Sequence, residues 1–217
     1  SVDHYQLEGE APQAFHIGTT QVHQGKGSTY SAFSGAFGGK LVRNNLTVGL
    51  NREGAACTLN GLYLVSGDQH VDNTTLIDHP KPHGTSRQLY KGILAGRATG
   101  VFSGRIFVHR DAQRTDAQQI NKNLLLSEEA TVDTKPQLEI LANDVTCTHG
   151  AAGGQLDEEA IFYLKTRGIG EVLASKLLSY GFANEVIGRV KLEALRKGLS
   201  QLVLGRLEEP SFQGVSP

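Results

Sequence analysis

Short apolar runs separated by polar turn residues make up the first two thirds of the chain. Such runs lie at 62–65, 101–102, 106–108 and 138–141, each shortly after a glycine or a proline. Runs of this length that are rich in Leu, Ile, Val and Phe are typical of β-strands. The pattern therefore predicts a mainly β fold built from many short strands.

Two β architectures accommodate such strands, a β-sandwich and a parallel β-helix of stacked coils. Asn-Gly and Asp-Gly hairpin signals are few, whereas asparagines accompany many of the apolar runs, at Asn45, Asn60, Asn73, Asn121, Asn123 and Asn143. We expect their amides to form hydrogen bonds at the corners of stacked coils. The sequence thus favours a parallel β-helix over residues 1–154, with parallel strands stacked from about residue 25 to residue 145.

A helical period of 3.6 replaces the strand pattern from residue 155 onward, which predicts a C-terminal helical segment over 155–217. Asp157 is a suitable N-cap for a first helix, and Gly168 is expected to end it. A second helix carries Leu173 and Leu177 on one face and is expected to close at Gly181.

A third helix is predicted from about residue 184 toward residue 206. Its apolar positions form a wider set than one small packing contact requires: Ile187, Val190, Ala194, Leu195, Leu199, Leu202 and Val203. We therefore expect the helical segment to present a surface to a partner protein.

Composition and charge narrow the functional classes. Lys and Arg number 21 against 22 Asp and Glu, so no net field attracts nucleic acid or an anionic membrane. No apolar run approaches the roughly 20 residues of a membrane span. The only cysteines, Cys57 and Cys147, form no disulfide framework, which fits a reducing compartment and a cytoplasmic location. Because the chain contains no Met, we expect it to have been cut from a longer protein.

Candidate chemistry is concentrated in residues 143–150, which are predicted to form a terminal strand leading into a small-residue turn. Cys147 and His149 are two positions apart, so a strand directs both side chains to the same face. This is the geometry of a ligand pair. Spacing alone favours a different interpretation, in which a buried Cys147 packs as a small apolar residue beside a hydrogen-bonded His149.

Other candidate motifs have weaker interpretations. Residues 78–86 include His79 and His83, but the prolines at 80 and 82 prevent the helix that would bring both rings to one face. This segment is predicted to be a structural loop. The glycines at 35, 38 and 39 are not followed by a helix, so they do not form a phosphate-binding loop.

An ordered series of motifs resembles the SufD family of iron–sulfur cluster assembly proteins. The motifs are DHP at 78–80, QLYKGIL at 88–94, GVFSGRI at 100–106, AQRTDA at 112–117, QINKNLLLS at 119–127, KPQLEI at 135–140, CTHG at 147–150 and QLDEEAIFYLKTRGI at 155–169. SufB-like chains carry a Cys-Glu-His-Glu run where this chain has Cys147-Thr148-His149-Gly150. SufD-like chains usually begin with a helical region that this sequence lacks, which fits a truncated chain.

The resemblance implies a right-handed parallel β-helix followed by a helical segment, in a complex with the SufB paralogue and the SufC ATPase. It implies that a nascent Fe–S cluster forms transiently at the SufB–SufD interface, with His149 as a ligand and Cys147 as a less certain one. SufC would bind the helical segment, for which Asp157, Phe162, Tyr163, Leu173 and Leu177 are the candidate residues. Self-association of the isolated chain is also open.

The resulting expectation is a non-catalytic scaffold subunit without a stably bound cluster, because two cysteines cannot supply the four thiolates of a usual [4Fe–4S] site. One alternative is a purely architectural SufD without any ligand role. A carbohydrate-active β-helix enzyme would need carboxylates clustered along one groove, whereas here the strand acids are scattered and Trp is absent. A cupin-like metal enzyme would need several histidines on neighbouring strands.

Overall fold

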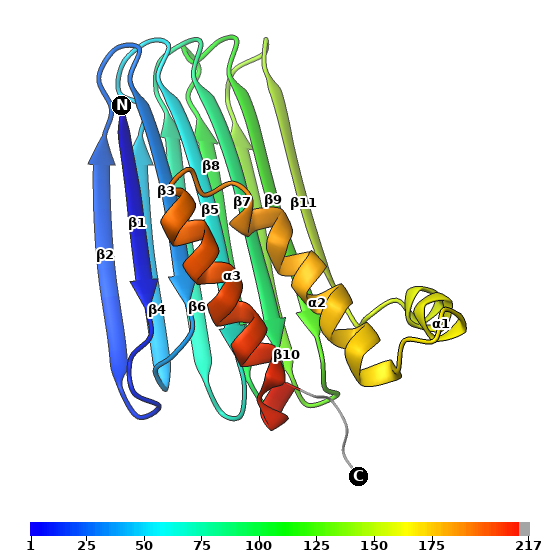
Figure 1. The fold of residues 1–217 in the computed structure, drawn as a ribbon. Coiled ribbons are helices and arrows are strands. Elements are labelled where there is room, and N and C mark those ends of the chain that lie inside the picture. Colours follow the sequence, from blue (N-terminus) through cyan, green and yellow to red (C-terminus); the bar gives the residue numbers. More distant parts are fainter. Residues whose placement is uncertain (213–217) are drawn as a thin grey trace.

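The computed structural model describes residues 1–212 and shows two stacked parallel sheets joined as the coils of a β-helix (Figure 1). Successive strands alternate between the sheets, and each strand pairs in parallel with the strand two positions further along the chain. This confirms the predicted parallel β-helix. The parallel strands begin at Val2 and end at Gly154, so they extend beyond the predicted range at both ends.

One sheet has six strands, in the spatial order β1 (Val2–Glu8), β3 (Thr29–Ala36), β5 (Ala56–Val65), β7 (Thr85–Leu94), β9 (Asp116–Leu125) and β11 (Thr146–Gly154). The other has five strands, in the order β10 (Thr131–Ile140), β8 (Thr99–Val108), β6 (His70–His79), β4 (Leu41–Gly49) and β2 (Phe15–His23). Ala56 of β5 pairs with Thr85 of β7, which pairs with Asp116 of β9, so one coil takes roughly 30 residues.

Strand composition explains which sheet faces are covered. β6 alternates buried and half-buried residues, as expected for a strand with one face toward the core and one toward solvent. The second half of β5, residues 60–65, is buried on both faces. Its inward residues Tyr63 and Val65 pack between the sheets, whereas Leu62 and Leu64 lie under the C-terminal helices.

The helices α1 (Glu158–Thr166), α2 (Glu171–Ile187) and α3 (Glu193–Glu208) follow β11, and a short 3₁₀ helix, η1 (Pro210–Phe212), ends the described chain. In Figure 1, α2 and α3 cross the outer face of the six-stranded sheet, while α1 lies beyond β11. α1 packs against α2, which also contacts β5 and β7. No helix within residues 1–212 is long and apolar enough to cross a lipid bilayer.

The ends of α1 agree with the sequence, but those of the next two helices do not. The Asp157 side chain accepts a hydrogen bond from the Glu159 amide at 2.9 Å, and Gly168, with φ of 83°, follows the helix end. α2, however, continues through Gly181 to Ile187, and α3 begins only at Glu193. A glycine inside a helix costs only about 1 kcal/mol, and the packing of Val186 and Ile187 on the sheet outweighs it.

Much of the apolar surplus expected on the third helix is used within the chain. Ile187, Val190, Leu199 and Val203 are buried in one cluster with residues of β5, β7 and β9. Leu202 and Leu204 of α3 remain partly exposed, and exposed apolar residues also lie on α1 and on the first half of α2. Residues 213–217, the end of the predicted helical segment, lie outside the described residues.

Five of the six asparagines lie within strands rather than at corners, contrary to the expectation, while Asn143 does lie at a corner, between β10 and β11. Asn60, Asn73, Asn121 and Asn123 are buried within strands, and Asn123 donates to Asn121 Oδ1 at 2.7 Å. At several corners the backbone instead adopts positive φ, at residues that include Gly54, Gly67, His83, Gly96 and Arg114. The corners at Gly54, His83 and Arg114 also stack, because each of these amides donates to a carbonyl one coil away, as from His83 to Gln113 at 3.0 Å.

Lys91 fixes α2 on the six-stranded sheet. Its side chain points outward from β7 and is only 2% exposed. The ammonium donates to the Phe182 carbonyl at 2.8 Å and to the carboxylate of Glu185, and it lies over the Phe182 ring. Burial lowers the pKa of Lys91, an effect that the carboxylate of Glu185 opposes, and the Lys91 hydrogen bond holds the pKa of Glu185 below its usual value.

We predict that Lys91→Ala lowers the free energy of unfolding by about 2–4 kcal/mol, since it removes the partner of a carbonyl and a carboxylate and leaves a cavity. Lys122 is the matched control, because its ammonium is half exposed and lies 3.9 Å from the same carboxylate. Lys122→Ala should cost less than about 0.5 kcal/mol. Urea unfolding measures both values, and equal losses would contradict the anchoring role of Lys91.

Candidate functional site

The last coil leaves the β-helix open at its C-terminal end. Within residues 1–212, β11 is paired only with β9 and β10 only with β8, so each presents one unpaired edge (Figure 1). β11 extends through Gly154, so the small residues expected to form a turn after His149 instead continue the strand. Pairing with β9 holds residues 150–154 of β11 in register with Ile120–Leu124.

The candidate pair lies on this terminal strand with both side chains on one face. Cys147 pairs with Ala117 of β9 and His149 with Gln119, and both partners are buried between the sheets. Cys147 is half-buried and packs against the inter-sheet core, whereas His149 is exposed. The strand therefore brings the two residues to the inward face, but only the imidazole is freely accessible.

The environment of Cys147 also disfavours the thiolate form that binds metals. Burial raises the pKa of the Cys147 thiol, although a hydrogen bond with the Ala117 backbone partly opposes the shift. The nearby carboxylate of Asp116 raises the pKa further. Because the thiolate is the form that binds metals, Cys147 is a weaker ligand than an ordinary exposed cysteine at neutral pH.

A complete metal site is not present among the described residues. Within residues 1–212, no group of three or more His, Cys, Asp or Glu side chains is arranged to hold a metal ion. His149 and Cys147 can therefore contribute only part of a ligand set, and the other donors would have to come from another molecule.

The histidines of residues 78–86 do not converge. His79 is fully buried at the end of β6, where its Nε2 lies 3.0 Å from Ser86 Oγ, and burial lowers its pKa to about 4. His83 lies in the following turn, 3.8 Å from the carboxylate of Glu53. The segment is a structural corner, in agreement with the interpretation from its prolines.

The candidate partner surface comprises Phe162 and Tyr163 on α1 with Leu173 and Leu177 on α2. Phe162 is 69% exposed and Leu173 is 53% exposed. Beside this surface is a groove of about 390 Å³ between α2 and the strands β9 and β11, lined by residues that include Lys122, Leu156, Leu178 and Phe182. Asp157 also lines the groove, but its contact with Glu159 gives it a capping role.

A polar cluster at the opposite end of the β-helix was not predicted from the sequence. Glu8 of β1 is buried and accepts a hydrogen bond from Asn44 at 2.9 Å. His16 lies 3.4 Å from Glu8 and 3.0 Å from Glu10. Desolvation is the largest effect on Glu8 and raises its pKa, while hydrogen bonds from Asn44 and Gln6 oppose that shift.

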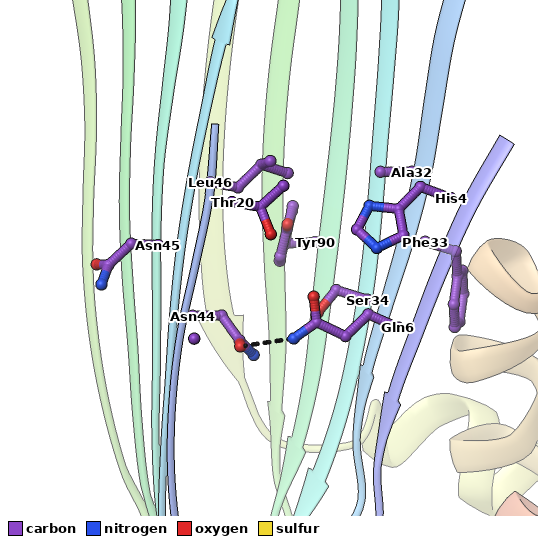
Figure 2. Close-up of a pocket in the computed structure, with 11 residues that line it drawn as sticks. His4, Gln6, Thr20, Ala32, Phe33, Ser34, Asn44, Asn45, Leu46 and Tyr90 are labelled. Carbon is purple, nitrogen blue, oxygen red and sulfur yellow. Dashed lines mark hydrogen bonds between the residues drawn. The ribbon is translucent and has the colours of Figure 1, made fainter. Parts of the chain in front are cut away.

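Figure 2 shows the adjoining pocket, in which Gln6 of β1 and Asn44 of β4 point toward each other between the two sheets. Their 3.2 Å hydrogen bond joins strands from different sheets, and Tyr90 and His4 line the same space. The pairing of β1 with β3 in one sheet and of β2 with β4 in the other brings these residues together, and no local sequence motif indicates it.

These observations define a parallel β-helix protein with a helical cover on one sheet and a Cys-x-His pair on its exposed terminal strand. The chain belongs to the SufBD core family, because residues 1–182 match the sequence model of the domain described as "SUF system FeS cluster assembly, SufBD core domain". The resemblance seen in the sequence motifs is thereby confirmed.

Curated relatives agree with this assignment. An iron–sulfur cluster assembly SufBD family protein of Synechocystis is 39% identical over 93% of this chain and 45% of its own length. The iron–sulfur cluster assembly protein SufD of Escherichia coli is 39% identical over 95% of this chain and 48% of its own length. The chloroplastic protein ABCI7 of Arabidopsis thaliana is 37% identical. The chain thus spans a little less than half the length of these relatives.

We predict that the two thiols react very differently with a maleimide in the native state. Cys57 is buried, which raises its pKa to about 12, so it should not react. Cys147 should react several-fold more slowly than free cysteine, because its thiol is half-buried and its pKa is raised. Mass spectrometry should find one label under native conditions and two in urea.

Cys147→Ser is the control for this labelling experiment, since it should remove the native label and leave the urea label on Cys57. Native labelling of Cys57, or labelling of Cys147 as fast as free cysteine, would contradict the burial of these thiols.

Proposed function

We propose that this chain acts as a non-catalytic, SufD-like scaffold subunit of the SUF iron–sulfur cluster assembly complex. Family membership and the relatives named SufD support this proposal. The observation that carries it is the exposed His149 on the terminal strand β11, which has one unpaired edge. ATP hydrolysis would belong to the SufC partner, since the described chain presents pairing edges rather than a phosphate-binding loop.

The unpaired edges of β10 and β11 support pairing with a SufB paralogue at this end of the β-helix. Unpaired strand edges form backbone hydrogen bonds with another chain most readily. Pro136 lies in β10 and has no amide hydrogen. A proline in an edge strand leaves fewer backbone donors with which unrelated chains could pair. The same edges would also accept a second copy of this chain in the absence of SufB.

The nascent Fe–S cluster is the cargo that this end of the complex would assemble. In the proposal, His149 donates an imidazole nitrogen to it, and the partner chain supplies the other ligands. A neutral imidazole suits iron, and because it carries no charge it binds iron more weakly than a thiolate does. A set containing His149 would therefore release its cluster more readily than a full thiolate set. Cys147, whose protonated thiol is favoured, would be an auxiliary ligand at most.

The exposed surface of Phe162, Tyr163, Leu173 and Leu177 supports a second contact, with the SufC ATPase. Large apolar side chains grouped at a protein surface commonly form the centre of an interface. These four residues do not cover the sheet, whereas Leu199 and Val203 of α3 do. They are therefore available to a partner.

We predict that His149→Ala leaves the subunit folded and the complex assembled but lowers the iron content of the complex at least about threefold, because an exposed imidazole adds little packing while its loss removes a ligand. The matched control is His23→Ala, which removes an exposed histidine from β2 at the opposite end. Complex mass and iron content are to be measured on the same sample.

Two outcomes would contradict the ligand role of His149. Unchanged iron content in a complex of full mass would mean that the chain is purely architectural. Loss of the SufB partner together with the iron would mean that His149 serves the interface between the chains. In the same complex, Cys147→Ser should have a milder effect than His149→Ala.

We also predict that the double substitution Leu173→Ala and Leu177→Ala weakens SufC binding by about 10- to 100-fold, as expected for the loss of two central apolar contacts. Leu204→Ala on α3 is the control, because Leu204 is 46% exposed but lies on another helix. These substitutions test SufC binding more specifically than truncation after Gly154, because truncation would also expose Leu62 and Leu64 of the sheet. Calorimetry measures the affinity, and an unchanged value would assign SufC binding elsewhere.

A further inference from the structure

A layer of polar side chains leads through the interior of the β-helix to His149. Three neighbouring strands of the six-stranded sheet contribute register partners to this layer, namely Gln88 of β7, Gln119 of β9 and His149 of β11. All three residues belong to the inward face of the sheet. One strand earlier, on β5, the same position is the apolar Leu59. The layer therefore changes from apolar to polar as it approaches the open end.

The two glutamines of this layer differ in how many of their polar atoms have a partner. The Gln88 amide nitrogen donates to Thr75 Oγ1 across the interior at 2.7 Å, and only its amide oxygen has no partner within residues 1–212. Gln119 is fully buried, yet within residues 1–212 neither its amide nitrogen nor its amide oxygen has a hydrogen-bond partner. A buried amide without a partner destabilises the fold, so an apolar residue would be more stable here.

Gly104 of β8 makes room for the Gln119 side chain. A Cβ atom on Gly104 would lie 1.8 Å from Gln119 Nε2, so only a glycine permits the amide to extend across the interior. Gly104 pairs with Thr75 on one side and with Pro136 on the other. The five-stranded sheet thus offers the amide of Gln119 a space, while the Thr75 hydroxyl already accepts from Gln88 and Pro136 has no polar side chain. The polar neighbour of Gln119 in its own layer on the open side is His149.

We propose that Gln119 is a positioning residue for His149. Neighbouring strands lie roughly 4.8 Å apart, so rotation of the amide brings it within reach of the imidazole one strand away. Gln119 Oε1 would accept a hydrogen bond from one ring N–H. The other ring nitrogen then carries the lone pair and faces the open end. Such an outer partner sets the tautomer and orientation of a ligating histidine.

The purpose of this contact rests on the function proposed above, but the contact itself does not. It is testable on the isolated chain by ¹⁵N NMR of the imidazole at one fixed pH, at which the ring is neutral. The shifts of the two ring nitrogens give the tautomer ratio of His149 directly. Fold stability is measured on the same samples by thermal unfolding.

Gln119→Met keeps the length of the side chain and removes the amide. It should change the tautomer ratio of His149 by about three- to tenfold, the effect of one net hydrogen bond, while the melting temperature stays equal or rises. Gln119→Glu keeps an acceptor at the same place and should preserve the wild-type tautomer preference. Gln88→Met is the control, because it changes the same layer one strand further from His149.

An unchanged tautomer ratio in Gln119→Met, or the same change in Gln88→Met, would overturn the proposal. If Gln119→Met does not fold, Gln119→Glu decides, since loss of the tautomer preference in that variant also overturns it. In the assembled complex, Gln119→Met should lower the iron content less than His149→Ala does. A tautomer effect combined with normal iron content in His149→Ala would uphold the positioning and refute the ligand role.

Discussion

In-register stacking of parallel coils is the constraint on which the rest of the structure depends. Each inward side chain rests on its partners in the coils before and after it, as Ser86 does between Cys57 and Ala117. Residues in the middle coils are therefore covered by chain on both sides. In the last coil of the described residues, β11 has a neighbouring strand on one side alone, so His149 shares a layer with buried residues and is still exposed.

The helical cover follows from the same stacking. Three neighbouring strands of the six-stranded sheet, β5, β7 and β9, have apolar outward residues in their second halves. These side chains form an apolar stripe on the outer face of the sheet, which water would contact if no helix covered it. α2 and α3 bury that stripe. Lys91 lies in its middle, and the pairing of its ammonium with Glu185 and the Phe182 carbonyl orients α2 on the sheet. The apolar residues of α1 and of the start of α2 lie outside this contact and remain exposed.

The sequence predicts the features that depend on local order along the chain. Strand-forming runs, the N-cap at Asp157 and the shared face of Cys147 and His149 all follow from short-range spacing. The asparagine positions were misinterpreted, because Asn121 and Asn123 find partners inside the β-helix that a single sequence does not reveal. The Glu8 cluster and the contact between Gln119 and Gly104 escape sequence analysis for the same reason, since their partners lie one or more strands away in space.

Buried polar atoms without a hydrogen-bond partner occur along the whole of the described β-helix. They include atoms of Glu10 and His16 in the first coil, of Asn60, His79 and Gln88 in the middle coils, and of Gln119 and Thr134 in the last coils. What differs between these places is access. A polar side chain in a middle coil is enclosed by the coils before and after it, whereas one in the last coil faces an unpaired strand edge and can be completed by groups from another molecule. Stacking therefore makes the last coil, where His149 lies, the place at which an external ligand or partner can reach the polar interior.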